Sequence, residues 1–264
     1  MPTALVRDGH LAYEQAGQGP LVVLLHGIGG SSRSWRHQLT GLADAFTVVA
    51  WDARGYGDSS DPPAGWAIAD YADDLAALLD HLGASRAHVV GLSMGGVIAL
   101  AFADRYPQRL DRLVLADTYC GGGTLPPAER QARLERRLAA VASGNLAQFA
   151  RERAAELLSP QAPATLHDEV AAIMAALHPQ GYRQAAIALA EADYRHVLPT
   201  ITAPTLVIWG SADRVLPRAE SERLAAGIPG ARLALIEGAG HAANQERPDE
   251  FNRLVRDFLL TAPA

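Results

Sequence analysis

The feature that most constrains the fold is the alternation of short apolar runs with amphipathic helical patterns. The runs are rich in Val, Leu and Ile on both faces, as expected for strands buried within a parallel sheet. Each is bounded by turn residues, and the clearest are Leu21–Leu25, Phe46–Trp51, Ala87–Gly91, Leu113–Ala116, Thr205–Trp209 and Leu233–Ile236. Strands that alternate with helices predict an α/β fold built on a mostly parallel, doubly wound sheet.

Helices are predicted where apolar residues recur at intervals of three and four. Over residues 70–82, aspartates lie at the N-terminal end, which the helix dipole favours, and Gly83 follows as a stop signal. The apolar stripe of this segment is Leu75, Leu78, Leu79 and Leu82. A final helix begins near Pro248 and carries the stripe Phe251, Leu254, Val255 and Phe258.

The alternation stops between about Gly121 and Pro199, where we find only helical patterns rich in Ala, Leu and Arg. We therefore predict a helical cap over residues 121–199, inserted into an α/β core of residues 1–120 and 200–264. One cap arginine could pair with a substrate carboxylate. Arginines at helical spacings usually face solvent, however, and we expect this of Arg130, Arg133, Arg136, Arg137, Arg151 and Arg153.

Composition excludes several classes of function. The 264 residues carry a formal charge of −6 without long runs of one sign, so we expect no nucleic-acid partner and no membrane association. All 23 basic residues are arginine, and without lysine Schiff-base and pyridoxal-phosphate chemistry is impossible. Cys120 is the single cysteine, which excludes redox pairs and cysteine-based zinc clusters. We expect a cytoplasmic protein that acts on a small molecule without cofactor or metal, and its oligomeric state stays open.

The segment Gly91-Leu92-Ser93-Met94-Gly95 matches the G-x-S-x-G pattern of a nucleophile elbow. It follows a predicted strand and leads into an apolar helix, which is the context that this pattern requires. A chain that turns directly from strand to helix holds the serine in a strained conformation, and small neighbours prevent clashes. We therefore predict that Ser93 is a nucleophile at the carboxyl end of its strand.

A serine hydroxyl is a poor nucleophile near neutral pH, so Ser93 needs a base, and the base needs a group that orients it. His241 lies in a glycine-rich loop after the last predicted strand, and we predict that it is the base. Asp213 directly follows an earlier strand, at the sheet edge where ligands gather, and we predict that it is the acid. Asp117 ends the strand before that one and remains a rival for this role.

Four further motifs accompany the elbow, and together the five resemble the α/β-hydrolase family over nearly the whole chain. They are His26-Gly27-Ile28-Gly29, Asp52-Ala53-Arg54-Gly55-Tyr56-Gly57-Asp58-Ser59, Gly210-Ser211-Ala212-Asp213 and Gly238-Ala239-Gly240-His241. In this family the chain order is nucleophile, acid, histidine, which is the order of Ser93, Asp213 and His241. The resemblance also implies an oxyanion hole made by the backbone N–H groups of Ile28 and Met94.

Several other conspicuous residues have structural interpretations. In the family that the chain resembles, His26 mainly shapes the oxyanion loop, and the segment 52–59 is a loop braced by its own polar side chains. Glu246 directly precedes a predicted helix and is interpreted as a helix-entry residue. Cys120 is interpreted as a small buried hydrophobic residue.

The leading hypothesis is hydrolysis of a small carboxylic ester or lactone through an acyl-enzyme on Ser93. Within the family, the elbow and the Gly-His-Ala-Ala-Asn segment around His241 most resemble 3-oxoadipate enol-lactonases and bacterial carboxylesterases. The alternatives are a carbon–carbon bond hydrolase, a cofactor-free perhydrolase and a ligand-binding protein without turnover. The first tends to carry Asn where Leu92 stands, and the second often carries an aromatic residue where Ile28 stands. Dehalogenases and epoxide hydrolases need an acid in place of Ser93 and are excluded.

Overall fold

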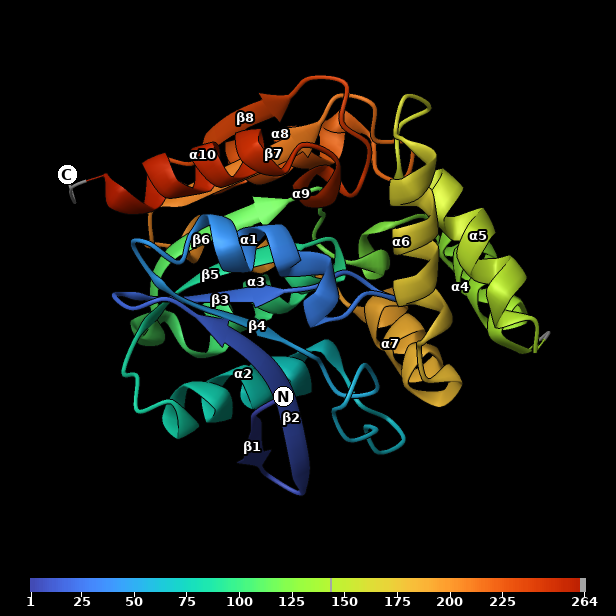
Figure 1. Ribbon diagram of the computed structural model, residues 1–264, viewed down its shortest axis with the longest axis horizontal. Helices are drawn as coiled ribbons and strands as arrows, with labels where there is room; N and C mark the ends of the chain where they lie inside the picture. Colours follow the sequence, from blue (N-terminus) through green and yellow to red (C-terminus); the bar gives the residue numbers. More distant parts are fainter. Residues whose placement is uncertain (143, 262–264) are drawn as a thin grey trace.

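An eight-stranded sheet forms the centre of the computed structural model, which describes residues 1–142 and 144–261 (Figure 1). The strand order is β1-β2-β4-β3-β5-β6-β7-β8. The pairings β1–β2 and β2–β4 are antiparallel, and all the others are parallel. The strands are β1 (Thr3–Val6), β2 (Gly9–Ala16), β3 (Leu21–Leu25), β4 (Thr47–Trp51), β5 (Ala87–Leu92), β6 (Leu110–Ala116), β7 (Thr205–Gly210) and β8 (Arg232–Ile236).

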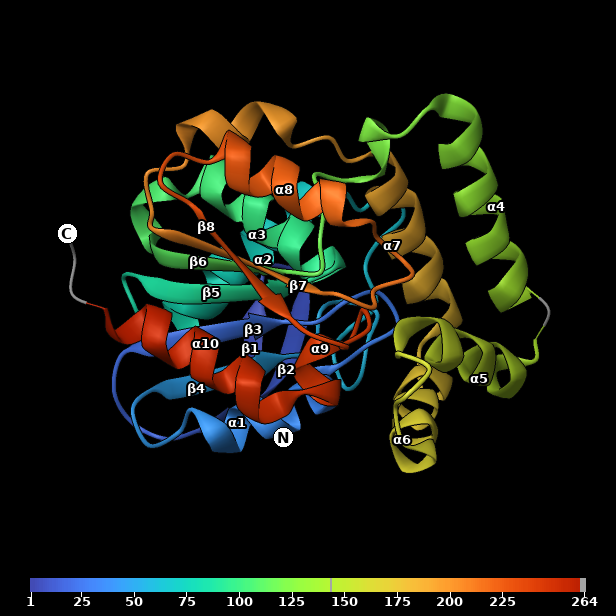
Figure 2. The same cartoon turned by 90° about the horizontal axis from the view of Figure 1, so that it is seen from above.

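Helices cover both faces of the sheet, and a further group of helices lies at one end of its strands. Figure 2 shows α4–α7 gathered at the end of the sheet that lies away from the C-terminus. The helices are α1 (Arg36–Gly41), α2 (Ile68–His81), α3 (Met94–Arg105), α4 (Pro127–Ala142), α5 (Leu146–Leu157), α6 (Ala164–Ala175), α7 (Pro179–Glu191), α8 (Arg218–Gly227), α9 (Ala243–Glu246) and α10 (Pro248–Leu260). Over the described residues, none of them combines the length and the apolar character that crossing a bilayer demands.

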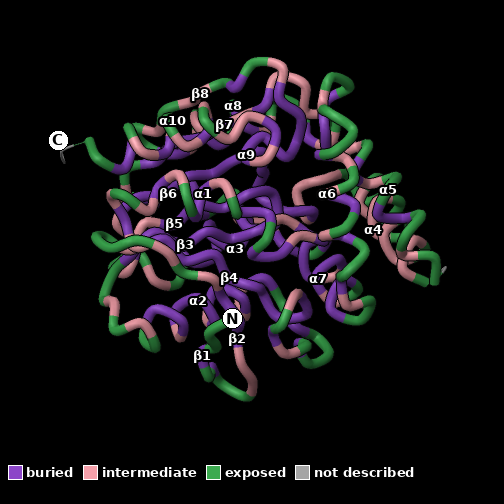
Figure 3. The backbone as a smooth tube through the Cα atoms, in the orientation of Figure 1, coloured by how far each residue is buried: buried purple, intermediate pink, exposed green. Residues whose placement is uncertain are grey.

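Side chains that alternate along the strands enter two separate apolar clusters, one on each face. In β3, Val23 and Leu25 belong to the cluster that α2 and α3 complete, whereas Val22 and Leu24 belong to the one that α1 and α10 complete. Both sets are fully buried, and Figure 3 shows that burial is concentrated in the central strands of the sheet. Each such side chain contributes about 1.5–3 kcal/mol of hydrophobic stabilisation, which explains why these strands are continuous apolar runs.

The prediction of a mostly parallel sheet is confirmed, and each of the six predicted strands is present. The hairpin of β1 and β2 was missed. It lies at the sheet edge, where β1 buries only alternate residues: Ala4 and Val6 are in the core, whereas Leu5 is 85% exposed. A strand with one solvated face has no continuous apolar run, so the pattern that predicts the central strands does not reveal this one.

The helices α4–α7 lie within the predicted cap, between β6 and β7, and no strand interrupts them among the described residues. A run of helices therefore interrupts the alternation of strands and helices at the expected place. Residue 143, inside the predicted cap, and residues 262–264, at the end of the predicted core, lie outside the described residues.

A buried ion pair ties the hairpin to the core. Arg54 Nε donates to Asp74 Oδ2 at 2.9 Å, and the two side chains are 1% and 0% exposed. The same guanidinium donates to the carbonyl oxygen of Val6 in β1 at 2.9 Å. Burial raises the pKa of Asp74 to about 6 in spite of the neighbouring positive charge. Removing Asp74 would leave the buried Arg54 charge with Asp8 as its ion-pair partner, at 3.1 Å, and the Asp8 side chain is 62% exposed and so compensates weakly.

We therefore expect Asp74→Asn to lower the free energy of unfolding by about 3 kcal/mol at pH 8, measured by urea titration. The matched control is Asp80→Asn on the same helix. Asp80 pairs with Arg109 at 2.7 Å, but its side chain is 70% exposed, so the loss should stay below about 1 kcal/mol. Equal losses in the two variants would contradict the importance of the buried pair.

Candidate active site

The elbow at Ser93 has the strained geometry that its motif predicts. Ser93 stands between β5 and α3 with φ 53° and ψ −115°. Such a conformation costs a residue other than glycine about 1–3 kcal/mol. A Cβ on Gly91 would lie 2.4 Å from the carbonyl oxygen of Gly95, and one on Gly95 would lie 2.0 Å from that of Leu25. The Thr118 hydroxyl donates to the carbonyl oxygen of Ser93 at 2.6 Å and braces the turn.

The predicted acid and base meet at the carboxyl edge of the sheet. Asp213 follows β7, His241 follows β8, and Oδ2 of the first lies 2.8 Å from Nδ1 of the second. The other carboxylate oxygen accepts the N–H groups of Val215 at 2.7 Å and Leu216 at 3.1 Å. Because a carboxylate only accepts, Nδ1 carries the proton and Nε2 is left as an acceptor. The His241 and Asp213 side chains are 4% and 0% exposed, so water does not compete for this bond.

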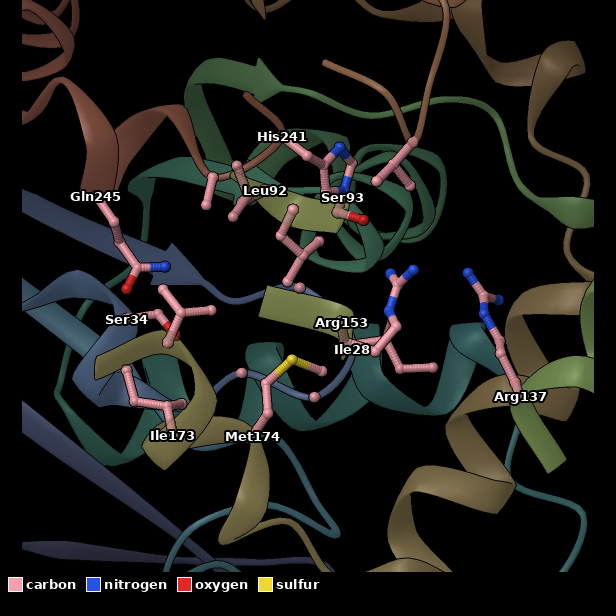
Figure 4. A pocket seen from close by; sticks show the side chains of 17 residues that line it. Ile28, Ser34, Leu92, Ser93, Arg137, Arg153, Ile173, Met174, His241 and Gln245 are labelled. Carbon is pink, nitrogen blue, oxygen red and sulfur yellow. The ribbon is translucent and has the colours of Figure 1, made fainter. Parts of the chain in front are cut away.

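Ser93 and His241 open onto one pocket with about 540 Å³ of empty space. Figure 4 shows the imidazole beside the Ser93 side chain. Within the described residues, the hydrogen-bond partner of the ring is Asp213. Among the described residues no hydrogen bond joins the Ser93 hydroxyl to His241, and such bonds often form only when substrate binds. Proton transfer between the two stays a prediction.

The two predicted oxyanion donors flank Ser93. Met94 is the first residue of α3, so its N–H has no acceptor within the helix. Ile28 follows β3 and lines the pocket, and its N–H makes no backbone hydrogen bond in the part of the chain that the structure describes. A Cβ on Gly27 would lie 3.2 Å from that of Ser93, so this glycine lets the loop approach the nucleophile closely. The oxyanion role of both N–H groups stays a prediction.

Asp117, the rival acid, contacts a different partner. It is fully buried at the end of β6, and its Oδ1 accepts the N–H of Gly210 at 2.7 Å. Burial raises the pKa of this carboxyl well above its usual value, and the negative charge of Asp213 acts in the same direction. Asp117 therefore holds the end of β7, whereas Asp213 is the carboxylate that contacts His241.

His26 and the loop 52–59 make structural contacts. His26 Nε2 accepts the N–H of Ala53 at 3.0 Å, and its Nδ1 donates to the carbonyl oxygen of the next residue at 2.9 Å. Burial lowers the pKa of His26, which favours the neutral ring that these two bonds require. Asp52 accepts the N–H of Asp58 at 3.2 Å across the loop. The ring of His26 is thus engaged in shaping the loops beside the pocket.

Cys120 is fully buried within the core. Burial raises the pKa of its thiol to about 11, so the thiol stays neutral near pH 7. A neutral, enclosed thiol is a poor nucleophile, which agrees with the interpretation of Cys120 as a small hydrophobic residue.

The interpretation of Glu246 as a helix-entry residue is incomplete. Its side chain is buried, and Oε2 accepts the N–H groups of Ser159 at 2.9 Å and Gly240 at 3.1 Å. The Ser159 hydroxyl donates to the other carboxylate oxygen. Gly240 directly precedes His241, so one carboxylate ties the histidine loop to the inserted helices. No local pattern could reveal this, because Ser159 lies 87 positions away in the sequence.

The inserted helices supply much of the pocket wall. The apolar side chains on this wall are Leu157, Val170, Ile173 and Met174. Arg137 of α4 and Arg153 of α5 also line the pocket and point into it in Figure 4. The expectation that the cap arginines face solvent is wrong for these two. The apolar stripe of α4 (Leu134, Leu138 and Val141) packs against the core, but helical periodicity does not show that Arg137 beside this stripe reaches the pocket.

Comparison with known proteins assigns the chain to a family. Its residues 20–248 match the family model described as the alpha/beta hydrolase fold. The chain belongs to the α/β-hydrolase family. The resemblance noted in the sequence motifs is thereby confirmed.

Relatives of this α/β-hydrolase carry several hydrolase names. It is 33% identical to a putative carbamate hydrolase of Yersinia enterocolitica over 90% of this chain and 87% of the relative. It is 30% identical to 3-oxoadipate enol-lactonase 2 of Acinetobacter baylyi over 97% and 96% of the two chains. The structure of a thermophilic esterase from Thermogutta terrifontis, solved with malate bound, superposes with a TM-score of 0.89 at 32% identity, covering 95% of this chain and 93% of that one.

The strain at Ser93 has a measurable consequence for this α/β-hydrolase. We expect Ser93→Gly to be more stable than Ser93→Ala by about 1 kcal/mol, because glycine tolerates the positive φ. In the buried strand β4, where φ is ordinary, Ala50→Gly should instead be destabilising by at least about 1 kcal/mol. Thermal and urea unfolding measure both changes. A less stable Ser93→Gly would mean that the elbow is unstrained.

Proposed function

We propose that this α/β-hydrolase cleaves a small carboxylic ester or lactone through an acyl-enzyme intermediate on Ser93. The observation that supports this most strongly is the buried hydrogen bond between Asp213 and His241, whose ring shares a pocket with Ser93. A neutral imidazole held in one tautomer beside a serine hydroxyl is the arrangement that nucleophilic acyl transfer requires. Relatives named as an esterase and an enol-lactonase, similar over nearly their whole length, support the same class of reaction.

In the first half-reaction, Nε2 of His241 takes the proton of the Ser93 hydroxyl while Oγ attacks the carbonyl carbon of the substrate. The carbonyl oxygen becomes an oxyanion, and the N–H groups of Ile28 and Met94 stabilise it by about 3 kcal/mol each. The carbon–oxygen bond then breaks, and His241 returns the proton to the departing alkoxide. In a lactone this alkoxide stays tethered, so the ring opens and the acyl-enzyme keeps the new alcohol.

In the second half-reaction, His241 removes a proton from water, and the hydroxide attacks the acyl carbon. The resulting oxyanion occupies the same position between the two N–H groups. Its collapse breaks the bond to Ser93 Oγ, which recovers its proton from His241, and the carboxylic acid leaves. The apolar wall supplied by α5 and α6 keeps bulk water away and strengthens the electrostatic contacts inside the pocket.

We expect Ser93→Ala to lower kcat for 4-nitrophenyl acetate by about 10⁶-fold, because the acyl group then has no acceptor on the protein. Asp213→Asn should lower kcat by about 10⁴-fold, since the amide no longer fixes the productive tautomer of His241. Asp117→Asn should lower kcat by less than about tenfold, because its carboxyl contacts Gly210 instead.

Two outcomes of this assay would contradict the proposal. Equal rates in the wild type and Ser93→Ala would remove Ser93 from the reaction. A near-normal kcat in Asp213→Asn, together with a large loss in Asp117→Asn, would transfer the role of acid to Asp117.

Glu246 acts in this proposal as a positioning residue for the base. Replacing it by Ala removes the acceptor of the N–H groups of Gly240 and Ser159, so the loop that carries His241 should shift. We expect Glu246→Ala to lower kcat about tenfold or more and to change KM by less than about twofold. Glu237→Ala, on the exposed part of the same loop, is the control and should keep both values. A loss in KM alone would indicate a role in binding.

A further inference from the structure

Two guanidinium groups reach the pocket that holds Ser93. Arg137 comes from α4 and Arg153 from α5, and both line the pocket together with His241. Figure 4 shows the two side chains projecting into the pocket on one side, with Gln245 on the opposite side. The pocket therefore has a cationic side and a side lined by neutral groups.

The positive charge on this side exceeds the negative charge that faces it. Glu156 pairs with Arg153 and also lies 3.7 Å from Arg136, so one carboxylate serves two guanidinium groups. Among the described residues, Arg137 has no carboxylate within ion-pair distance, and the pocket lining includes no Asp or Glu. The carboxylate of Asp213 is fully buried and engaged by His241. The lining thus offers two guanidinium groups and no acid.

Arg153 is held in place rather than free in solvent. Its side chain is 13% exposed, and burial lowers its pKa, although an arginine stays protonated near pH 7. A charged group taken out of water needs an opposite charge to offset the loss of hydration. Glu156, which also lies near Arg136, provides only part of this opposite charge. An anionic ligand would supply the rest.

We propose that Arg137 and Arg153 form a carboxylate-binding subsite, so that the substrate is an ester or lactone with a free carboxylate on a short aliphatic chain. The identity of the reacting group rests on the proposed function. The planar forks of two guanidinium groups match a carboxylate, and the apolar side chains that line the same pocket suit methylene groups.

The charged residues around the pocket also favour an anionic ligand. A second cavity beside the pocket shares Arg137 and Arg153 and adds Arg133, Arg136 and Arg214, with Glu156 as its single acid among the described residues. Guanidinium groups clustered around an opening raise the local concentration of anions and speed their association. This field is screened by salt, so the preference for anions should weaken as ionic strength rises.

The test compares esters that differ only in one terminal group. Monomethyl glutarate and methyl pentanoate differ by a carboxylate in place of a methyl group on the acyl side. The compounds 4-acetoxybutanoate and butyl acetate differ in the same way on the alcohol side. Titration of the released acid at constant pH gives kcat/KM for each. In the wild type we expect at least one anionic ester to exceed its neutral partner by about tenfold or more.

The variants Arg137→Gln and Arg153→Gln should each lower this ratio of anionic to neutral kcat/KM by about tenfold or more. Arg151→Gln is the matched control, since Arg151 lies exposed on α5 and should leave the ratio unchanged. Wild-type ratios near one for both pairs, or unchanged ratios in the two pocket variants, would overturn the subsite.

A binding measurement separates this inference from the proposed function. Glutarate is titrated by calorimetry into Ser93→Ala, alone and combined with Arg137→Gln or Arg153→Gln. Saturable binding that weakens about tenfold in the combined variants supports the subsite even if none of the four esters is hydrolysed. Absence of binding up to roughly 10 mM, or binding that the arginine variants leave unchanged, overturns it. Hydrolysis of methyl pentanoate that persists in Ser93→Ala would instead contradict the proposed function.

Discussion

The hydrogen bond between His241 and Asp213 is the interaction on which the rest of the site depends. It joins two loops that leave neighbouring parallel strands, and the pairing of Gly210 with Ile236 brings β7 and β8 to the same edge of the sheet. In water such a bond contributes little, because solvent competes for both partners. Here both side chains are buried and the second carboxylate oxygen accepts two backbone N–H groups, so the ring keeps one orientation toward the pocket.

The inserted helices cover the site and also contact the two loops that carry Asp213 and His241. The chain around 155–159 contacts both loops: Arg214, next to Asp213, donates to the carbonyl oxygens of Ala155 and Leu158, and Ala242, next to His241, donates to that of Leu157 at 3.2 Å. Glu246 adds the contacts to Ser159 and Gly240. Substitutions at the end of α5 are therefore expected to alter the positions of Asp213 and His241, although α5 lies outside the α/β core.

The sequence was most informative where one local rule decides the structure. The central strands are apolar on both faces, and the elbow needs small residues at 91 and 95, so both could be predicted from short segments. Prediction failed where the surroundings decide. The first hairpin has one solvated face, and Glu246 acquires its role from a distant serine. The periodicity of α4 does not show that Arg137, beside its apolar stripe, lines the pocket.

The sequence by itself determined the α/β-hydrolase fold, the strained serine, and the chain order of Ser93, Asp213 and His241. Hydrophobic periodicity predicts the mostly parallel sheet, and small residues around Ser93 predict the strained turn, because both act over a few neighbouring residues. The family and the roles of the three residues came from the motifs that resemble α/β-hydrolases. Only the tertiary structure decided that Asp213 rather than Asp117 contacts the histidine, and that Arg137 and Arg153 face the pocket. Both outcomes depend on how distant segments pack across the edge of the sheet, and helical or strand periodicity carries no information on that packing.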